Sequence, residues 1–585
     1  MFRGSVVRRQ LALALVFGCS FFGQLGVALA SEDLLPDFYA DPAISTSKGF
    51  MGDRGGVTVD PFTGMASARA TDIVVPGNAG FDIRITRTYN NLQPYQAPEI
   101  SPFGVGWSMH YGEIRISNPD KMCDRYYNVN TADNPVFVSP SGSSHLLYMP
   151  GLYPAVENGD NLVYVSDAYH SVYCQPDDSI YIIDSSGMRY DFSARVYDSQ
   201  IGGPATWYVT RVTDRNGNYL DISYLNAGYY GGLGRVIGSI SANDGRTVTF
   251  NYANLSDSSA RLASIVTPVG NWTYTYETRS FGTYGTYAVL TRVSDPESLS
   301  WQYDYHPFST DNAAESGSLK EVINPHGARE VLSYNKIRFN PGWPSSTENF
   351  VVETHYKESG VESIGTWTYD YSQSTSGDVT TISGPDGTRT YEHFGVMKAT
   401  NNNLWRIGTL ERMTYTPSNV DSPTRIEVNE WEPHVLSFES YVRVRKYDTG
   451  FPMPTDYRYS VPRLKSTTVT IGDGTFFTEN RVFQHDAAKP AGSNYDIAAP
   501  PYPIEIYEQT STPDFTGSRT IHRNYHQIAN KWLFGLVMNE GYDDEIYAYM
   551  AREYDSLGNV TMQYDKGVRT YFSYHPDGTI WEQWY

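Results

Sequence analysis

The sequence predicts an all-β protein in which antiparallel β-hairpin repeats curl into a spiral shell or partial cocoon. Composition is the first observation, because 48 Tyr and 50 Gly in 585 residues favour strands and turns over helices. The second is a recurring motif, in which a four-residue turn precedes a strand of alternating aromatic residues. A chain of this length exceeds the usual single domain, so it forms either several domains or a repeat array.

The recurring unit begins with the turn and ends on a tyrosine. The turns have Asp214, Ala242, Thr267, Asp295 and Asn324 at the first position and Gly217, Gly245, Gly270, Ser298 and Gly327 at the fourth. The units end at Tyr224, Tyr252, Tyr276, Tyr305 and Tyr334, which are 24 to 29 residues apart. Five units in one register predict a repeat array rather than a set of unrelated turns.

Elementary chemistry explains why such a unit forms a hairpin. Asp or Asn at the first position accepts hydrogen bonds from the backbone two residues on, and Gly at the fourth tolerates the positive φ of a bulged type I turn. After the turn the side chains alternate, so that Val248, Phe250 and Tyr252 share one face of a strand. One hairpin is marginal in water, whereas stacked hairpins bury each other's apolar faces and extend a twisted sheet.

The pattern returns near the end of the sequence. Asp555–Gly558 precedes Tyr564 and His575–Gly578 precedes Tyr585, so we expect two further units there. The predicted organisation is a signal peptide at 1–30, a linker at 31–50, an N-terminal β segment at 51–120, a β segment leading into the repeats at 121–200, the array at 201–340, a divergent β-shell region with insertions at 341–530, and C-terminal repeats at 531–585.

The first 30 residues predict export. Three arginines precede an apolar run from Leu11 to Phe22, and Ala30 offers a small residue for cleavage before Ser31, which is the layout of a secretory signal peptide with a helical core. The alternatives are an uncleaved anchor, which the interrupted run disfavours, and lipidation at Cys19. No later run reaches the roughly 18 apolar residues of a membrane helix. We expect a mature chain without a membrane span that is secreted, periplasmic or held at the cell surface.

The net charge bears on the possible partners, and the cysteines bear on a possible disulfide. The net charge is −21, and an acidic surface repels phosphate backbones, so nucleic acid is not an expected partner. After signal cleavage two cysteines remain, Cys123 and Cys174. Export permits a disulfide between them, but the sequence leaves open whether they meet.

Two groups of residues resemble bacterial Rhs proteins. Asp214–Asn218 with Tyr224, and Glu553–Asn559, look like YD repeats, which are also similar to repeats of teneurins and of toxin-complex shell proteins. The segments Val59–Gly64, Pro76–Gly77, Arg87–Asn90 and Pro102–Trp107 resemble the part that opens the Rhs shell. The resemblance implies a hollow β-shell, which in many relatives encloses a C-terminal toxin. The D-P-x-G-L-type motif at which some relatives cleave themselves does not occur here, so neither self-cleavage nor a toxin is carried over.

The block that begins at Pro102 is expected to have a structural role. Gly104 and Gly106 permit a tight corner, while Phe103 and Trp107 plug the opening turn of the shell. The alternative is a ligand site, because aromatic residues and glycines often line sugar sites.

Three short motifs could carry chemistry, and each has a plainer explanation. His522 and His526 could share a strand face, but no further ligand stands at metal-site spacing. Asp214, Asn216 and Asn218 faintly resemble a calcium loop, but the glycine is fourth rather than sixth. The sequence Ser45–Lys48 has the spacing of some acyl-transfer enzymes without their companion motifs. We therefore predict no catalytic residue, cofactor or metal.

The predicted function is an exported, non-catalytic YD-repeat scaffold. It would form part of a shell for toxin encapsulation or delivery, or for cell-surface interaction, without a toxin domain of its own. Two alternatives stay open, a carbohydrate-binding surface protein and an exported glycan hydrolase. The expected partners are another Rhs shell segment, a toxin cargo or surface glycans, and the open strand edge of a partial spiral allows self-association.

Overall fold

The computed structural model describes most of the chain after residue 55. The described residues are 56–90, 101–116, 135–140, 142–148, 162–175, 179–197, 205–229, 232–254, 260–282, 285–308, 315–339, 347–360, 362–400, 403–436, 460–472, 474–483, 487–488, 497–498, 500–542 and 549–585. The predicted signal helix, its cleavage site at Ala30 and Ser31, Cys19, and the Ser45–Lys48 motif lie outside them. Helix occurs among the described residues as short 3-10 turns, η2 (Asn78–Gly80), η6 (Val396–Lys398), η7 (Leu404–Arg406) and η8 (Ala529–Lys531).

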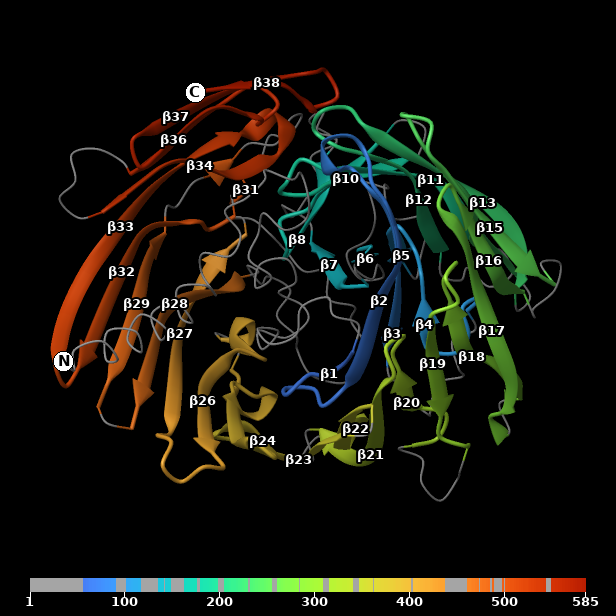
Figure 1. Cartoon of the computed structure of the whole chain (residues 1–585), viewed down its shortest axis with the longest axis horizontal. Coiled ribbons are helices and arrows are strands. Elements are labelled where there is room, and N and C mark those ends of the chain that lie inside the picture. Colours follow the sequence, from blue (N-terminus) through green and yellow to red (C-terminus); the bar gives the residue numbers. More distant parts are fainter. Residues whose placement is uncertain are drawn as a thin grey trace, which may run out of the picture.

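A small sheet of four antiparallel strands lies inside the molecule, and we call it the inner sheet. Its strands are β1 (Val57–Val59), β2 (Ala66–Val75), β3 (Ile83–Asn90) and β4 (Trp107–Ser108), paired in that order. Strand β3 alternates between buried and more exposed positions along its length, as a strand covered on one face should. Figure 1 shows these strands, in blue, crossing the interior of a curved wall.

The wall begins as a closed ring of strands. Strand β5 pairs with β6 on one side and with β12 on the other, so the sheet from β5 to β12 closes on itself. The strands of this ring are β5 (Glu113–Ile116), β6 (Val136–Val138), β7 (Ser144–Tyr148), β8 (Leu162–Ser166), β9 (Ser171–Cys174), β10 (Ile180–Ile183), β11 (Arg189–Tyr197) and β12 (Ala205–Thr213). Cys174 in β9 is disulfide-bonded, and Cys123 lies outside the described residues.

From β12 the same sheet continues as an antiparallel array of hairpins. Its first part contains β13 (Tyr219–Tyr229), β14 (Gly232–Ala242), β15 (Thr247–Ala253), β16 (Arg261–Thr267), β17 (Gly270–Ser280), β18 (Thr286–Ser294), β19 (Ser300–Tyr305), β20 (Leu319–Ile323), β21 (Ala328–Phe339), β22 (Thr347–Ser359), β23 (Glu362–Ser374), β24 (Gly377–Gly384) and β25 (Gly387–His393). Its second part contains β26 (Leu410–Pro417), β27 (Arg425–Val435), β28 (Ser460–Ile471), β29 (Phe476–Phe483), β32 (Pro503–Thr512), β33 (Phe515–Ile528), β34 (Leu533–Tyr542), β35 (Met550–Tyr554), β36 (Val560–Asp565), β37 (Val568–Tyr574) and β38 (Ile580–Trp584). Strands β30 (Ala487–Ala488) and β31 (Ile497–Ala498) pair with each other.

The hairpins of the array fork, and the forks account for its curvature. Strands β12 and β13 pair near their turn, from Arg211–Asp221 to Thr213–Tyr219, and then separate, each to pair with its other neighbour. Beside the fork, the pairing of β13 with the next strand, β14, shifts by one residue between Ser223 and Tyr224. Such bulges bend a strand and increase its twist. Because they recur along the array, the sheet curls.

The wall returns to its own beginning. Figure 1 shows the C-terminal strands, in red, lying beside the early strands at the top of the molecule. Two side-chain hydrogen bonds join the turn at Asp214–Asn218 to the two C-terminal turns, from Asn218 Nδ2 to the Asp577 carbonyl at 2.7 Å and from Asn559 Nδ2 to Asn216 Oδ1 at 2.9 Å. We call this junction the clasp. Beside it, Trp532 donates from its ring nitrogen to the carbonyl of Tyr169.

The core lies between the inner sheet and the first half of the wall. One cluster of buried side chains runs from Val57 through Trp107 to Val352, and a second joins the ring to Trp532 and Phe534. The predicted fold class is thereby confirmed, because one antiparallel β-sheet curls into a shell. Among the described residues, no helix has the length and apolar character that crossing a membrane requires.

Candidate functional site: the repeat latch and the plugged interior

Most forks of the array are bridged by the hydroxyl of one tyrosine, which we call the latch tyrosine. The hydroxyl donates to a backbone carbonyl on the partner strand of the same hairpin, beyond the last paired residues. The pairs are Tyr224 with Val209 at 2.6 Å, Tyr252 with Ile237 at 2.9 Å, Tyr305 with Leu290 at 2.8 Å, Tyr334 with Leu319 at 2.7 Å, Tyr371 with Val352 at 3.0 Å, Tyr525 with Pro503 at 3.0 Å, Tyr554 with Val537 at 2.7 Å, and Tyr574 with Val560 at 2.7 Å. The latch satisfies a carbonyl that the fork removes from the ladder.

The latches form a relay along the array. Tyr305 lies opposite Leu319 at a bulge, and the carbonyl of Leu319 accepts the next latch, Tyr334. Tyr334 in turn lies opposite Val352, whose carbonyl accepts Tyr371. The same rule joins Tyr554, opposite Val560, to Tyr574. In these steps each hairpin therefore positions the acceptor for the hairpin that follows.

The predicted turn residues lie at the ends of these hairpins. Asp214 Oδ1 accepts the backbone N–H groups of Asn216 and Asn218, and Oδ2 accepts the Asn218 amide. The carboxylate of Asp555 is bonded in the same way by Leu557 and Asn559, while Asp295 accepts Glu297 and Leu299. The predicted glycines have positive φ, at 87° for Gly217, 92° for Gly245, 139° for Gly270, 85° for Gly327 and 83° for Gly558.

Two details of the repeat differ from the sequence expectation. Thr267 pairs directly with Gly270, so this turn has the two-residue loop Pro268–Val269 instead of the bulged form. In the C-terminal region the turn at Asp555–Gly558 leads to β36, which contains Tyr564 as expected. The latches there, however, are Tyr554 and Tyr574, which precede the turns. The bulge position, which the spacing of turns does not encode, decides which tyrosine becomes the latch.

The predicted opening block, Pro102–Trp107, lies between the inner sheet and the wall. Phe103 and Trp107 are buried, and the Trp107 ring nitrogen donates to the hydroxyl of Tyr305 at 2.7 Å. Gly104 and Gly106 have φ of 91° and 79°. A Cβ on Gly106 would lie 2.5 Å from the ring of Tyr89, and a Cβ on Gly104 would lie 2.8 Å from the backbone nitrogen of Leu290. Both glycines therefore allow close approach as well as a corner.

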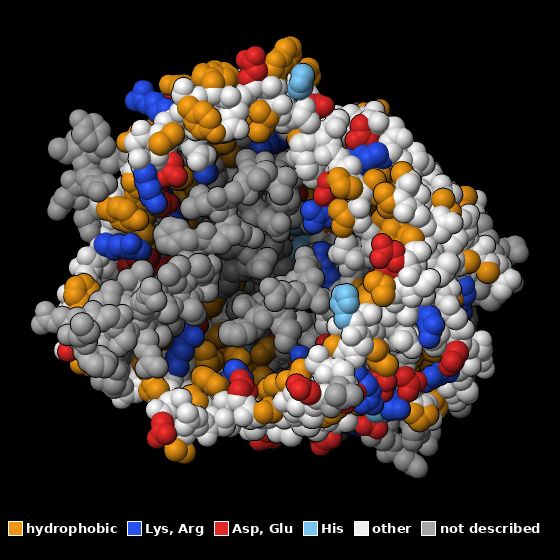
Figure 2. Space-filling model, viewed as in Figure 1, with side chains coloured by type: hydrophobic (Ala, Val, Ile, Leu, Met, Phe, Trp, Pro, Cys, Tyr) orange, Lys and Arg blue, Asp and Glu red, His pale blue; other side chains and the backbone are white. Residues whose placement is uncertain are grey.

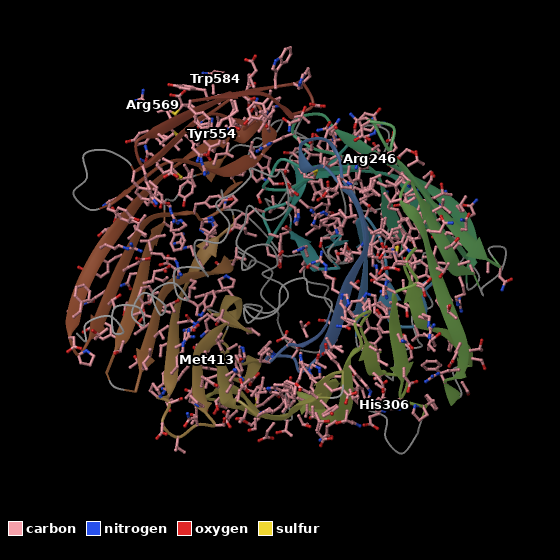
Figure 3. All side chains as sticks on the ribbon, viewed as in Figure 1. Arg246, His306, Met413, Tyr554, Arg569 and Trp584 are labelled. Carbon is pink, nitrogen blue, oxygen red and sulfur yellow. The ribbon has the colours of Figure 1, made fainter. Side chains whose placement is uncertain are left out.

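The block also joins the wall through its backbone. The carbonyl of Pro102 accepts the N–H of Leu262 at 2.9 Å, and the N–H of Val105 donates to Ala288 at 3.1 Å. Tyr276, which we predicted as a repeat tyrosine, donates to Pro102 at 3.3 Å. Figure 3 labels another link, Arg246, whose guanidinium donates to the carbonyls of Val75 and Phe81 in and beside the inner sheet.

A buried ion pair lies under the block. Arg87 donates through Nε and Nη2 to the carboxylate of Asp72 at 2.6 and 2.9 Å, with the two side chains 0% and 1% exposed. Tyr303 accepts from Arg87 and Tyr274 donates to Asp72, and the ring of Trp107 lies 4.9 Å from the guanidinium carbon. Burial opposes the charge on Arg87, but Asp72 and the two tyrosines outweigh it, so the pKa of Arg87 lies above its usual value.

Sequence reasoning missed this ion pair. Arg87 belongs to one of the segments that resemble the start of an Rhs shell, but Asp72 lies in no motif. The two tyrosines come from β17 and β19, some two hundred residues away. A charged residue inside an alternating apolar strand was the available signal, because a buried charge requires a partner.

A second missed pair lies where the inner sheet meets β24 and β25. Asp378 faces His393 across the two strands, and the turn of the inner sheet covers them, with the Phe62 ring 5.3 Å from His393 and Thr380 donating to the Pro61 carbonyl. Within the described part of the chain, neither His393 nitrogen has a hydrogen-bond partner, nor does Asp378 Oδ1. Burial raises the pKa of Asp378 to about 6 and lowers that of His393 to about 4.

The remaining sequence candidates do not come together. His522 lies 3.7 Å from Glu505 on the neighbouring strand, and His526 stacks on Tyr554. No group of three or more potential metal ligands occurs in the part of the chain that the structure describes. The oxygens of Asp214 are occupied by N–H donors. What the described site does is hold strands and an inner sheet together by hydroxyl, backbone and ion-pair contacts.

Comparison with known proteins places one match on the inner sheet and the start of the wall. Residues 56–133 match a family described as a domain of unknown function, DUF6531. No curated protein matches the chain.

Several solved structures are similar over most of this chain at low identity. The TcdB2-TccC3 structure is 9% identical, with 91% of this chain and 44% of that chain covered and a TM-score of 0.28. A Tc holotoxin pore from Photorhabdus luminescens is 9% identical, with 94% and 44% covered and a TM-score of 0.29. The N-terminal domain of the effector SpvB from Salmonella typhimurium strain LT2 is 14% identical, with 50% and 99% covered and a TM-score of 0.21. The chain spans less than half the length of the first two, and scores this low carry no argument about its function.

Proposed function

We propose that this protein is an exported, non-catalytic shell scaffold of the Rhs type that encloses a polypeptide. One observation supports the proposal above all: a single sheet from β5 to β38 closes at its start through β12 and returns to that start through the clasp. The latch relay gives each hairpin a fixed curvature, which is what a wall requires. The family match at residues 56–133 covers the same stretch that resembles the opening of an Rhs shell.

The position of the inner sheet supports the proposal that the wall encloses polypeptide. Val57 in β1 is 1% exposed, and the carbonyl of Gly64 accepts the N–H of Val352 on the wall at 2.9 Å. Because β1 belongs to the inner sheet, we expect a reporter inserted next to it to lie within the wall. Tyr585, by contrast, is 84% exposed, so we expect a reporter attached after it to be accessible to a protease.

A protease-protection experiment tests the proposal. An unstructured reporter with several trypsin sites is inserted before Gly56 in the full chain, and a matched variant carries the same reporter after Tyr585. We expect the first reporter to survive native digestion much longer than the second, and both to be cleaved at the same rate in denaturant. Equal cleavage rates in native buffer would refute enclosure. For the export step, N-terminal sequencing of the secreted protein should begin at Ser31.

A further inference from the structure

Two aromatic residues with left-handed backbones meet where the ring touches a late part of the wall. Tyr169 lies in the turn between β8 and β9, Trp532 lies between η8 and β34, and their φ angles are 61° and 54°. Such a backbone is costly for residues other than glycine and persists where surrounding contacts impose it. The Trp532 ring nitrogen donates to the Tyr169 carbonyl at 2.7 Å. We call this pair the ring contact.

One hydroxyl holds the turn that carries Tyr169. Ser166 Oγ accepts the N–H groups of Ala168 at 3.1 Å and of His170 at 3.2 Å, and it lies 2.7 Å from Nδ1 of the His170 ring. A serine hydroxyl has two acceptor positions and one proton. Since N–H groups occupy both acceptor positions, the hydroxyl proton is donated to Nδ1. The hydrogen bonds therefore assign His170 as neutral, with its own proton on Nε2.

A second proton on His170 would break this arrangement. It would place an N–H at Nδ1 opposite a hydroxyl that has no acceptor position left, so either the ring turns away or the turn gives up a hydrogen bond. His170 is 8% exposed and packs edge-on against the ring of Phe137 at 5.0 Å, so its charge would be poorly solvated. Burial accordingly lowers the pKa of His170 well below 6.5, and the nearby His145 adds to that shift.

The acidic residue of the turn is bonded to another histidine. Asp167 Oδ1 lies 3.1 Å from Nδ1 of His145 in β7, and the His145 ring is 5.0 Å from the His170 ring. A proton on His145 would form an ion pair with Asp167 and would oppose a second charge on His170. The turn thus offers His170 a competing cation rather than a counter-charge.

The ring of Tyr169 faces a further titratable group, His434, at 5.9 Å. Arg463 lies 3.3 Å from Nδ1 of His434 and also pairs with Glu432. Because a guanidinium can only donate, Nδ1 of His434 is an acceptor in this contact. His434 therefore has to be tested separately from His170.

Resting on the proposed shell function, we infer that the ring contact is released by acid, because a proton on His170 frees the Tyr169 turn and with it Trp532. The released turn solvates His170 and relieves the left-handed backbone. The contact is closed at neutral pH, and the ratio of open to closed rises by up to about tenfold for each pH unit below about 6.5.

Release of Trp532 loosens a late strand from the ring. The residues after Trp532 also touch the ring, since Leu533 forms a bridge with Ser186 and the N–H of Phe534 donates to the Ser185 carbonyl at 3.1 Å. Figure 2 shows that the wall surrounds a central hollow. Acid would therefore open this wall at one defined junction.

Hydrogen exchange at residues 529–536 of the full chain measures the opening, once it is corrected for the intrinsic effect of pH on exchange. We expect roughly 10- to 30-fold more opening at pH 5.0 than at pH 7.5, and no such change in β14–β21. His170→Asn is the matched variant, because its side-chain oxygen can accept from Ser166 but takes up no proton. It should stay closed at both pH values. An equal acid response in this variant, or none in the unchanged chain, would overturn the inference.

Three further variants locate the proton. His145→Asn, which keeps a donor for Asp167, and His434→Gln should each leave the acid response in place. Loss of the response in either would assign the proton to that histidine and overturn the inference. Ser166→Ala should open the contact already at pH 7.5, and this result decides the matter if His170→Asn does not fold, since a closed contact in Ser166→Ala would contradict the role of the hydroxyl.

The outcome is separable from that of the shell proposal. The interior reporter digested at pH 7.5 tests enclosure alone. A protected reporter without an acid response at residues 529–536 would refute the acid release alone, and an acid response with an unprotected reporter would refute the shell alone.

Discussion

The hydroxyl of Tyr276 donates a hydrogen bond to the carbonyl oxygen of Pro102 at 3.3 Å. By the latch rule its acceptor would be the carbonyl of Leu262, which lies opposite the preceding latch, Tyr252. Instead the N–H of Leu262 donates to the same Pro102 oxygen, so the opening block enters the fork of this hairpin and takes the acceptor role. The interior and the wall are thus joined through one repeat unit, and their stabilities are coupled.

Removing the hydroxyl of a latch tyrosine should lower the free energy of unfolding by an amount that depends on how many hydrogen bonds that hydroxyl makes. Tyr252→Phe loses one hydrogen bond to Ile237 and should lower the free energy of unfolding by about 0.5–1.5 kcal/mol. Tyr305→Phe also leaves the buried ring nitrogen of Trp107 without its acceptor, which adds roughly 1–3 kcal/mol. Urea denaturation followed by tryptophan fluorescence measures both. Tyr585→Phe, at an exposed ring, is the control, and equal effects for the two latches would contradict the assigned contacts.

Two glycines with similar backbone angles should respond differently to alanine. Gly217 has φ of 87° and open space around it, so Gly217→Ala should cost only the left-handed strain of about 1–2 kcal/mol. Gly106→Ala carries the same strain and places a methyl 2.5 Å from the ring of Tyr89, whose hydroxyl accepts a hydrogen bond from Leu319 and cannot easily move. We expect roughly 1–3 kcal/mol more, measured as the shift in denaturation midpoint. Similar shifts for both variants would contradict the close packing of the block.

The buried ion pair should cost most when one partner is removed. Arg87→Met leaves the carboxylate of Asp72 buried without its bidentate partner and should lower the free energy of unfolding by about 3–5 kcal/mol. The double variant with Asp72→Leu should recover much of that loss, because no unpaired charge remains. The matched control is the exposed pair of Arg211 and Asp221, where Arg211→Met should cost less than about 1 kcal/mol. A double-mutant cycle gives the coupling, and a double variant no better than Arg87→Met would contradict this account.

Local chemistry made the hairpins predictable. The bonding of Asp214, the positive φ of Gly217 and the burial of Val248 and Phe250 follow from residues a few positions apart. The latch acceptors do not, because a one-residue bulge sets them, and so the sequence did not indicate the latch role of Tyr554. The contact between Asp72 and Tyr274 joins segments that only the curl of the wall brings together.

Stability should depend on pH through Asp378. Burial raises the pKa of this carboxyl to about 6, above the value near 3.9 of an unfolded aspartate, so the folded state binds the proton more tightly. The residue is therefore neutral at no cost below about pH 4, and its destabilising charge develops as the pH rises to about 6 and above. Asp378→Asn should raise the thermal midpoint at pH 8 and much less at pH 4.

The neighbouring residue His393 should make stability depend on pH in the opposite direction. Burial lowers the pKa of His393 to about 4, so the folded state loses stability as the pH falls from about 6.5 to about 4 and the unfolded state takes up the proton. His393→Gln should therefore reduce the loss of stability between pH 6.5 and pH 4. Thermal denaturation across pH 4–8 measures both variants. A midpoint for Asp378→Asn that is offset equally at all pH values would show that the carboxyl does not titrate as stated.

The clasp should control the release of the C-terminal hairpins. Asn218 and Asn559 each bond the aspartate of their own turn and also reach across to the facing turn. Replacing both by alanine removes the two cross-turn hydrogen bonds, worth about 1–3 kcal/mol together, and also the two bonds to the turn aspartates. Local opening should therefore become more frequent by at least roughly 5- to 150-fold. Native-state hydrogen exchange should show this acceleration at residues 549–585 and not in β14–β21. Asn251→Ala, which removes an exposed bond to Ser264, is the control. Acceleration spread evenly over the whole array would mean that the wall opens as one unit and that the clasp does not control the opening of the C-terminal hairpins.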